Sequence, residues 1–174
     1  MNLYILRHAS AGTPRKNPVT NDKRGLDKEG KQQCVLIANY LNATRVAFDA
    51  VISSPLKRSL QTASLVATEI GYEARIAVDE SLAPSGTYES FARLLHRHVG
   101  QENILVVGHN PNLSQFLGTL ISGNGASVRL RKGSLVRLDY TRRPAQLLSL
   151  VEPRMLRQIY ASMAKSSRRK TSRK

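Results

Sequence analysis

Arg7 and His8 are the first residues in the chain whose types suggest chemistry. They follow an apolar run at residues 3–6 and precede small residues at 9–12. A buried strand that ends in a polar pair and a flexible turn often places reactive groups at a sheet edge. A neutral imidazole can attack phosphorus, and a guanidinium can bind two phosphoryl oxygens at once. We therefore interpret His8 as a nucleophile and Arg7 as part of an anion-binding site.

Two later segments supply the groups that such a nucleophile needs. Arg58 falls in the first turn of a helix expected to start at Ser54-Pro55, where the backbone N–H groups also favour anions. His109 follows an apolar run at 104–107 and could stabilise charge on the phosphoryl oxygens. Taken alone, Arg58 is a solvated helix residue and His109 is a capping or core histidine. Their joint position after separate strands favours the catalytic interpretation.

Arg24 and Glu80 are further candidates. Arg24 lies in a polar loop expected over residues 9–27 and is the third arginine that could bind phosphate. Glu80 follows a short strand expected near 74–78 and is the candidate general acid for a phosphate ester, whose alkoxide leaving group needs a proton. The alternative for Glu80 is a surface carboxylate that pairs with a basic neighbour.

Residue spacing argues against a metal or nucleotide site. Cys34 is the only cysteine, so no disulfide within the chain is expected. The histidines show neither His-x-x-x-His nor His-Glu-x-x-His spacing, and no Gly-x-x-x-x-Gly-Lys loop is present. His96 and His98 are two positions apart in an expected helix, cannot share a face, and are interpreted as surface residues. The sequence therefore predicts no cofactor and no bound metal.

Alternating strands and helices must position these groups. Strands are expected at residues 2–6, 50–53, 74–78 and 104–107, and helices at 28–43, 55–70, 87–98 and 111–121. Ser54 and Asn110, each followed by Pro, are expected to be the N-caps of two of these helices. Two further strands at 134–139 and 146–151 are expected as an antiparallel pair at the edge, before a last helix opened by Pro153. This order predicts an α/β fold, a three-layer α/β/α sandwich with a mainly parallel central sheet. Ligands bind beyond the carboxyl ends of such strands, so the three segments would meet at one edge.

Length and composition indicate one folded domain, expected over residues 1–164. A chain of 174 residues with 41% hydrophobic residues suits a globular domain. No apolar run approaches the roughly 18 residues that span a bilayer, so no membrane association is expected. Arg7 interrupts the apolar run near the N-terminus, which argues against a signal peptide. The single cysteine agrees with a cytoplasmic location.

The chain is strongly basic, with a formal net charge of +15. Residues 165–174 carry six Lys or Arg, no acid and no apolar residue, and are expected to form a disordered basic tail. The rest of the chain still carries an excess of basic residues. Two interpretations remain open: a solvated basic surface, or a surface that attracts an acidic or polyanionic partner.

Three segments resemble the signature segments of the histidine phosphatase superfamily, the phosphoglycerate-mutase-like group. They are Leu-Arg-His-Ala at 6–9, Ser-Ser-Pro-Leu-Lys-Arg-Ser-Leu-Gln-Thr-Ala at 53–63 and Val-Gly-His-Asn-Pro at 107–111. The resemblance covers about residues 1–151. It implies that His8 is the phosphorylated nucleophile and that Arg7, Arg58 and His109 form the phosphate pocket.

Two shorter segments resemble the small SixA-like phosphohistidine phosphatase branch. They are Arg-Gly-Leu-Asp-x-x-Gly at 24–30 and Glu-Ser-Leu-Ala-Pro at 80–84. The match implies that Arg24 is a further phosphate or substrate contact. Gly25 and Asp27 stand where that branch has Pro and Thr, which predicts a more mobile loop.

The resemblance implies a metal-independent phosphatase that acts through phospho-His8. The expected substrate is a protein phosphohistidine, for example on a phosphotransfer domain in signal transduction, because a labile N–P bond needs little help from an acid. The first alternative is a general or small-molecule phosphomonoesterase that uses Glu80 as general acid. A mutase is disfavoured because the short chain lacks lid elements. An alternative of another class is a polyanion- or protein-binding module with vestigial catalysis, against which the intact Arg7, His8, Arg58 and His109 argue.

Overall fold

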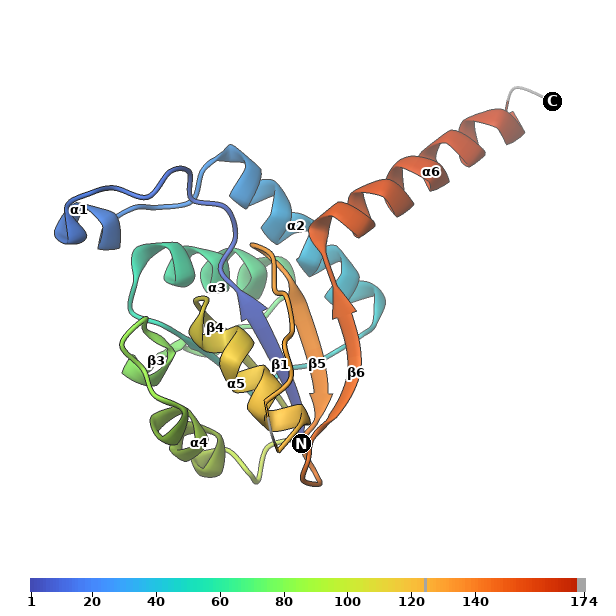
Figure 1. The fold of residues 1–174 in the computed structure, drawn as a ribbon. Helices are drawn as coiled ribbons and strands as arrows, with labels where there is room; N and C mark the ends of the chain where they lie inside the picture. Colours follow the sequence, from blue (N-terminus) through green and yellow to red (C-terminus); the bar gives the residue numbers. More distant parts are fainter. Residues whose placement is uncertain (124, 172–174) are drawn as a thin grey trace.

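A six-stranded sheet forms the centre of the protein (Figure 1). The structure, a computed structural model, describes residues 1–123 and 125–171, with residues 165–171 described as backbone only. The strands are β1 (Asn2–Arg7), β2 (Ala50–Ser53), β3 (Ala77–Val78), β4 (Asn103–Gly108), β5 (Leu135–Asp139) and β6 (Gln146–Val151). Their order across the sheet is β3-β2-β4-β1-β5-β6.

The first four strands are parallel, and β5 and β6 form the antiparallel part of the sheet. Ser53 pairs with Val107 and Arg7 pairs with Gly108, so β1, β2 and β4 end at nearly the same level. Because β6 runs antiparallel to β5, it also ends at this edge, with Val151 opposite Leu135. The mixed α/β fold with a mostly parallel sheet and an antiparallel edge pair confirms the predicted fold class.

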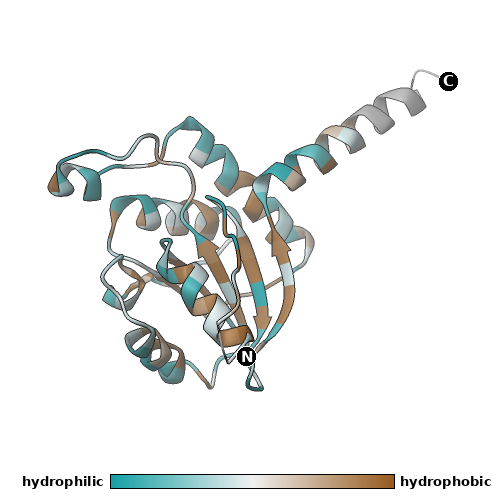
Figure 2. Cartoon of the chain, viewed as in Figure 1, coloured by the Kyte–Doolittle hydropathy of each residue, from teal (hydrophilic) through white to brown (hydrophobic). Residues whose placement is uncertain are grey.

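Helices cover both faces of the sheet (Figure 1). They are α1 (Pro18–Asp22), α2 (Lys28–Ala43), α3 (Lys57–Glu69), the short 3-10 helix η1 (Glu80–Leu82), α4 (Tyr88–Arg97), α5 (Asn112–Ile121) and α6 (Pro153–Thr171). Alternate residues of each strand point to opposite faces. In β1, Leu3 and Ile5 pack with α4 and α5, whereas Tyr4 and Leu6 pack with α2, α3 and the start of α6. The central strands therefore bury apolar residues on both faces of the sheet. Figure 2 shows that the strands consist mostly of hydrophobic residues.

Cys34 lies in this core and is 2% exposed. It packs in the cluster that includes Leu6, Ile37 and Val107 between α2 and the sheet. Burial raises the pKa of its thiol to about 12, so the thiol stays protonated. Cys34 is thus a small apolar residue of the core.

Two predicted helix caps are wrong. Ser54 does not cap α3, which begins at Lys57 with Leu56 at its N-cap, because the Ser54 hydroxyl lies against His109. Asn110 does not cap α5, which begins at Asn112, because its side-chain amide donates to the Leu130 carbonyl. Tertiary contacts at the edge of the sheet have replaced the local capping that the Ser-Pro and Asn-Pro pairs favour.

The loop predicted over residues 9–27 contains a short helix, α1. Asn17 caps it, since its side-chain oxygen accepts hydrogen bonds from the backbone N–H groups of Val19 and Thr20. Pro18 occupies the first helical position, where its missing N–H costs nothing. The strand expected over residues 74–78 is shorter than predicted and covers Ala77–Val78 alone.

The last helix is longer than predicted. Pro153 opens it as expected, but α6 continues to Thr171, so residues 165–171 are helical where a disordered tail was predicted. Residues 172–174 of that predicted tail lie outside the described residues. Leu156 is buried and Tyr160 packs on the core, which fixes the first turns of α6. Beyond them the helix extends away from the sheet (Figure 1). In the described ranges, no helix has the length and apolar character that a membrane crossing needs.

Candidate active site

The predicted site residues follow the ends of β1, β2 and β4. The backbone N–H of His8 donates to the Gly108 carbonyl at 3.0 Å, and that of Ser54 donates to the Val107 carbonyl at 2.9 Å. These bonds continue the sheet just past its strands, so the three segments lie side by side. The rings of His8 and His109 are 5.0 Å apart between centroids. The fold therefore brings together residues that are about a hundred positions apart in the sequence.

His8 is held as a neutral imidazole with one free lone pair. Its Nδ1 lies 2.8 Å from the carbonyl oxygen of Ala9, which can only accept, so the ring proton sits on Nδ1. Burial, together with the nearby charges of Arg58 and Arg7, lowers the pKa of His8 to about 3. Nε2 is then unprotonated at neutral pH, as a nucleophile requires.

Arg58 and Arg7 place two cations beside this ring. Arg58 is 6% exposed, and its Nη1 donates to the Asn21 carbonyl at 3.2 Å. The Nη1 of Arg7 donates to the Leu130 carbonyl at 2.8 Å. The Nε atoms of both are buried without a hydrogen-bond partner in the described part of the chain. Burial lowers the pKa of each guanidinium because it removes the water that stabilises the charged form. Both groups stay charged at neutral pH. Cationic groups whose buried N–H donors have no partner favour an anion.

His109 is a second neutral imidazole, buried next to the first. Burial lowers its pKa to about 2, followed by the effects of His8 and Arg58. Its Nε2 lies 2.8 Å from the Ser54 hydroxyl and 3.3 Å from that of Ser59. The Ser54 oxygen already accepts from the Leu56 N–H, so its own proton can point to Nε2. This arrangement favours a proton on Nδ1, which is buried with no partner among the described residues.

Arg24 also lies at this site, and its Nη1 and Nε donors are used within the protein. Nη1 donates to the carbonyls of Ala11 and Gly12, at 2.6 and 3.1 Å, and Nε donates to the side chain of Asn21 at 3.0 Å. Its charge still helps to lower the pKa of His8 and of His109. Arg24 therefore braces the loop after His8 and adds to the positive potential around it.

Glu80 lies at the same edge but is not brought to the two histidines by any contact in the described structure. Its segment is close to the strand ends, since the Asp79 N–H donates to the Ser53 carbonyl at 3.0 Å. The Glu80 side chain is exposed and forms no hydrogen bond or ion pair with described residues. The surface ion pair considered for Glu80 is made by its neighbour Asp79, which binds Arg97.

Thr62 supports the segment that carries His8, and sequence reasoning missed it. Its hydroxyl donates to the Arg58 carbonyl at 2.7 Å and accepts from the Ala9 N–H at 3.1 Å. It thus links the helix that carries Arg58 to the residue that fixes the His8 tautomer. The available signal was its position four residues after Arg58, which puts both on one helix face.

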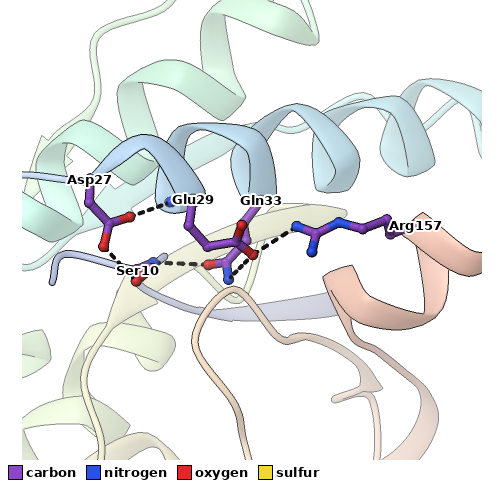
Figure 3. A network of polar contacts seen from close by, with 6 residues as sticks. Ser10, Asp27, Glu29, Gln33 and Arg157 are labelled. Carbon is purple, nitrogen blue, oxygen red and sulfur yellow. Dashed lines mark hydrogen bonds and ion pairs between the residues drawn. The ribbon is translucent and has the colours of Figure 1, made fainter.

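Asp27 fastens the loop that was predicted to be more mobile (Figure 3). One carboxylate oxygen accepts from the Ser10 hydroxyl at 2.8 Å and the Gly12 N–H at 2.7 Å, and the other caps α2 through the Gly30 N–H at 2.7 Å. A Cβ on Gly30 would lie 2.0 Å from the Ser10 carbonyl oxygen, so only glycine allows this close approach. Asp27 therefore ties this loop to the first turn of α2, where a more mobile loop was predicted.

The assembled groups suit phosphoryl transfer. They comprise a neutral imidazole suited to be a nucleophile, the buried guanidinium of Arg58, the half-buried guanidinium of Arg7 and a second imidazole with a free N–H. In the described part of the chain, no three His, Cys, Asp or Glu side chains are grouped as a metal site.

The site and the fold agree with the relatives of this chain. A family model described as histidine phosphatase superfamily (branch 1) matches residues 3–84. An uncharacterised protein of Picosynechococcus sp. is 30% identical over 142 residues, which make up 79% of this chain and 84% of that protein. Phosphohistidine phosphatase SixA of Escherichia coli is 26% identical over 125 residues, 71% of this chain and 76% of SixA. The chain belongs to the histidine phosphatase superfamily.

Solved structures share the fold. The protein histidine phosphatase SixA complexed with tungstate superimposes with a TM-score of 0.80 at 20% identity, covering 90% of this chain and 99% of SixA. An alpha-ribazole phosphatase from Shigella flexneri gives a TM-score of 0.67 at 19% identity, covering 88% of this chain and 97% of that one. The same fold thus occurs in proteins named for different substrates.

The two buried histidines are expected to make folding sensitive to mild acid. Their folded pKa values lie far below the roughly 6.5 of an unfolded histidine, so below pH 6.5 the unfolded chain binds more protons. Stability is then fully present above pH 6.5 and is lost as the pH falls toward 3. Between pH 6.5 and 5 we expect each histidine to lower the free energy of unfolding by about 1.5 kcal/mol. Urea titrations of the wild type and of His8→Asn/His109→Asn measure this, and an equal decline in both would contradict it.

Proposed function

We propose that this protein is a phosphatase that removes phosphate from a protein phosphohistidine through a covalent phospho-His8 intermediate. The observation that carries the proposal is the state of His8: its Nδ1 proton is committed to the Ala9 carbonyl, and its low pKa leaves Nε2 unprotonated. Arg7, Arg58 and His109 surround this nucleophile with N–H donors. Membership of the histidine phosphatase superfamily supports phosphatase chemistry.

In the proposed reaction, His8 Nε2 attacks the phosphorus atom of the substrate. A bond forms between Nε2 and phosphorus while the substrate N–P bond breaks, and the substrate histidine leaves with that electron pair. Arg7 and Arg58 bind the phosphoryl oxygens, and His109 donates an N–H as the transition state forms. Water then attacks phospho-His8, which releases inorganic phosphate and restores the imidazole.

The leaving group supports a phosphohistidine substrate. A phosphoimidazole that is protonated on its other nitrogen leaves as neutral imidazole and needs no proton from the enzyme. A phosphomonoester leaves as an alkoxide and needs a general acid. Glu80, the predicted acid, is exposed and makes no described contact with the site, and the likeness to SixA points the same way. We propose a phosphorylated phosphotransfer domain as the partner.

Replacing Glu80 with Gln is expected to leave phosphohistidine hydrolysis within about twofold of wild type, because that leaving group needs no general acid. The measurement is kcat/KM of both proteins on a phosphohistidine protein and on a panel of phosphomonoesters. Glu73→Gln, which changes another exposed carboxylate, is the matched control.

The same comparison tests the alternative of a phosphomonoesterase with Glu80 as general acid. In that case wild type would prefer phosphomonoesters, and Glu80→Gln would lower their turnover by roughly 100-fold or more. That pair of results would replace the proposed substrate class.

A further inference from the structure

A basic cleft lies next to the phosphate site and shares Arg7 with it. The cleft has a volume of about 370 Å³ and is lined by the first turns of α2, the segment 129–132 and the first turns of α6. These elements meet because β6 ends at the same edge of the sheet as β1, so α6 starts there. The cleft thus opens beside the residues that we propose to perform phosphoryl transfer.

The charges in this cleft are unbalanced. Six cationic side chains line it, against the two carboxylates of Glu29 and Glu152. Glu29 is paired with Arg157 at 2.7 Å, and Glu152 is 3.5 Å from Arg131. Arg7 belongs to the phosphate site described above. The last three cations, Arg129, Lys132 and Arg154, form no ion pair with described residues.

Hydrogen bonds fix the position of the cleft relative to His8. The Leu130 carbonyl, between two of the basic residues, accepts from Arg7 Nη1 at 2.8 Å. The Gly133 N–H lies 3.1 Å from the Arg7 carbonyl and 3.2 Å from that of His8. The segment that carries Arg129 and Lys132 is therefore fastened to the nucleophile's own backbone.

The opposite wall is connected to the nucleophile as well (Figure 3). Arg157 of α6 donates to Glu29 of α2, whose carboxylate also accepts from the Gln33 amide at 3.3 Å. The Gln33 side-chain oxygen accepts from the Ser10 N–H at 2.9 Å. This chain of contacts fixes the start of α6, and with it Arg154, relative to the loop after His8.

We propose that this cleft binds an acidic peptide segment that flanks the phosphohistidine of a substrate protein. The inference rests on the proposed function and adds that the enzyme recognises acidic residues beside the phosphohistidine. Arg129 and Arg154 are exposed, and the free cations come from two elements along an open cleft. A single compact phosphate is better held by converging buried donors, as at Arg58. Dispersed cations in an open cleft instead match carboxylates spaced along an extended chain.

The test uses synthetic phosphohistidine peptides whose flanking residues are either Glu or Gln. The triple variant Arg129→Gln/Lys132→Gln/Arg154→Gln is compared with Arg75→Gln/Arg93→Gln/Arg142→Gln, which removes the same charge from exposed positions outside the cleft. We expect the cleft variant to lower kcat/KM for the Glu-flanked peptide by about tenfold, through KM, with kcat unchanged. Turnover of the Gln-flanked peptide and of an aryl phosphate should not change.

Other outcomes overturn the proposal. An equal loss of kcat/KM in the control variant would mean that the effect comes from net charge. A small substrate with a second phosphate is measured as well. If the cleft variant loses kcat/KM for that substrate alone, the cleft binds small molecules. If wild type hydrolyses none of these substrates, the proposed function fails, and binding of the unphosphorylated Glu-rich peptide decides the cleft separately. Equal affinity of wild type and cleft variant for that peptide would then reject the docking site.

Discussion

Replacing His8 with Ala is expected to reduce hydrolysis of both an aryl phosphate and a phosphohistidine protein by roughly 10⁴-fold or more. The reason is that, in the proposed mechanism, Nε2 of His8 is the atom that bonds to phosphorus. His109, the other imidazole nearby, has its Nε2 occupied by Ser54 and Ser59. The measurement is kcat for both substrates with purified wild type and variant.

A folding control keeps this prediction interpretable. His8 is buried, so His8→Asn, which retains a polar side chain, is measured alongside, together with circular dichroism and thermal unfolding of both variants. Loss of activity in a folded His8→Asn protein is the expected result. Turnover above a few per cent of wild type in either folded variant would show that His8 is not the nucleophile.

Replacing Arg58 with Met is expected to lower kcat by about 10³-fold, because a guanidinium that binds the phosphoryl oxygens stabilises the charge of the transition state. Met keeps much of the side-chain length without the charge. The change also removes one of the charges that lower the pKa of His8, so that pKa should rise. Steady-state kinetics on an aryl phosphate give kcat, and NMR titration of the ring follows the pKa.

Lys57→Met is the matched control for Arg58→Met. Lys57 begins the same helix, is exposed and precedes Arg58 by one position. It should change kcat by less than about twofold, as expected of a solvated surface charge. Equal losses in the two variants would mean that positive charge at the helix start, and not the position of Arg58, supports turnover.

Much of the fold could be predicted from the sequence because the central strands β1, β2 and β4 contain short, continuous apolar runs. Residues 104–107 are buried from both faces, and such runs are typical of a central parallel strand. Since parallel strands end at one edge, the polar residues after them could be placed together before any distance was known. The proximity of His8, His109 and Arg58 followed from this rule.

The parts that sequence reasoning missed depend on contacts between distant segments. The Ser54 hydroxyl does not cap a helix but forms a hydrogen bond with His109, which is 55 positions away in the chain. Asp27 was predicted to make its loop more mobile, but its two carboxylate oxygens accept hydrogen bonds from Ser10, Gly12 and Gly30. Ser, Asp and Asn side chains can cap a helix or form hydrogen bonds to a distant loop. Which of the two they do depends on the segments that the fold brings next to them.

The extent of α6 and the basic cleft also needed the structure. The polar composition beyond residue 164 predicted disorder, yet the backbone stays helical to Thr171. The cations of the cleft lie in segments 129–132 and 153–157, which have no motif in common. They meet because β5 and β6 run antiparallel and return the chain to the edge where β1 ends.

The central claim, that phosphate passes through His8, is tested most directly by trapping the intermediate. Wild type is mixed with a phosphohistidine protein, quenched in alkali within its first turnovers, and mapped by mass spectrometry. The expected result is a phosphoryl group on His8 that is stable in alkali, labile in acid and absent from His8→Asn. A phosphoryl group on another residue would contradict the claim. Turnover without any phosphoenzyme, together with inverted configuration at a chiral phosphorus, would also contradict it. Transfer through His8 takes two displacements, so it predicts that the configuration at phosphorus is retained overall.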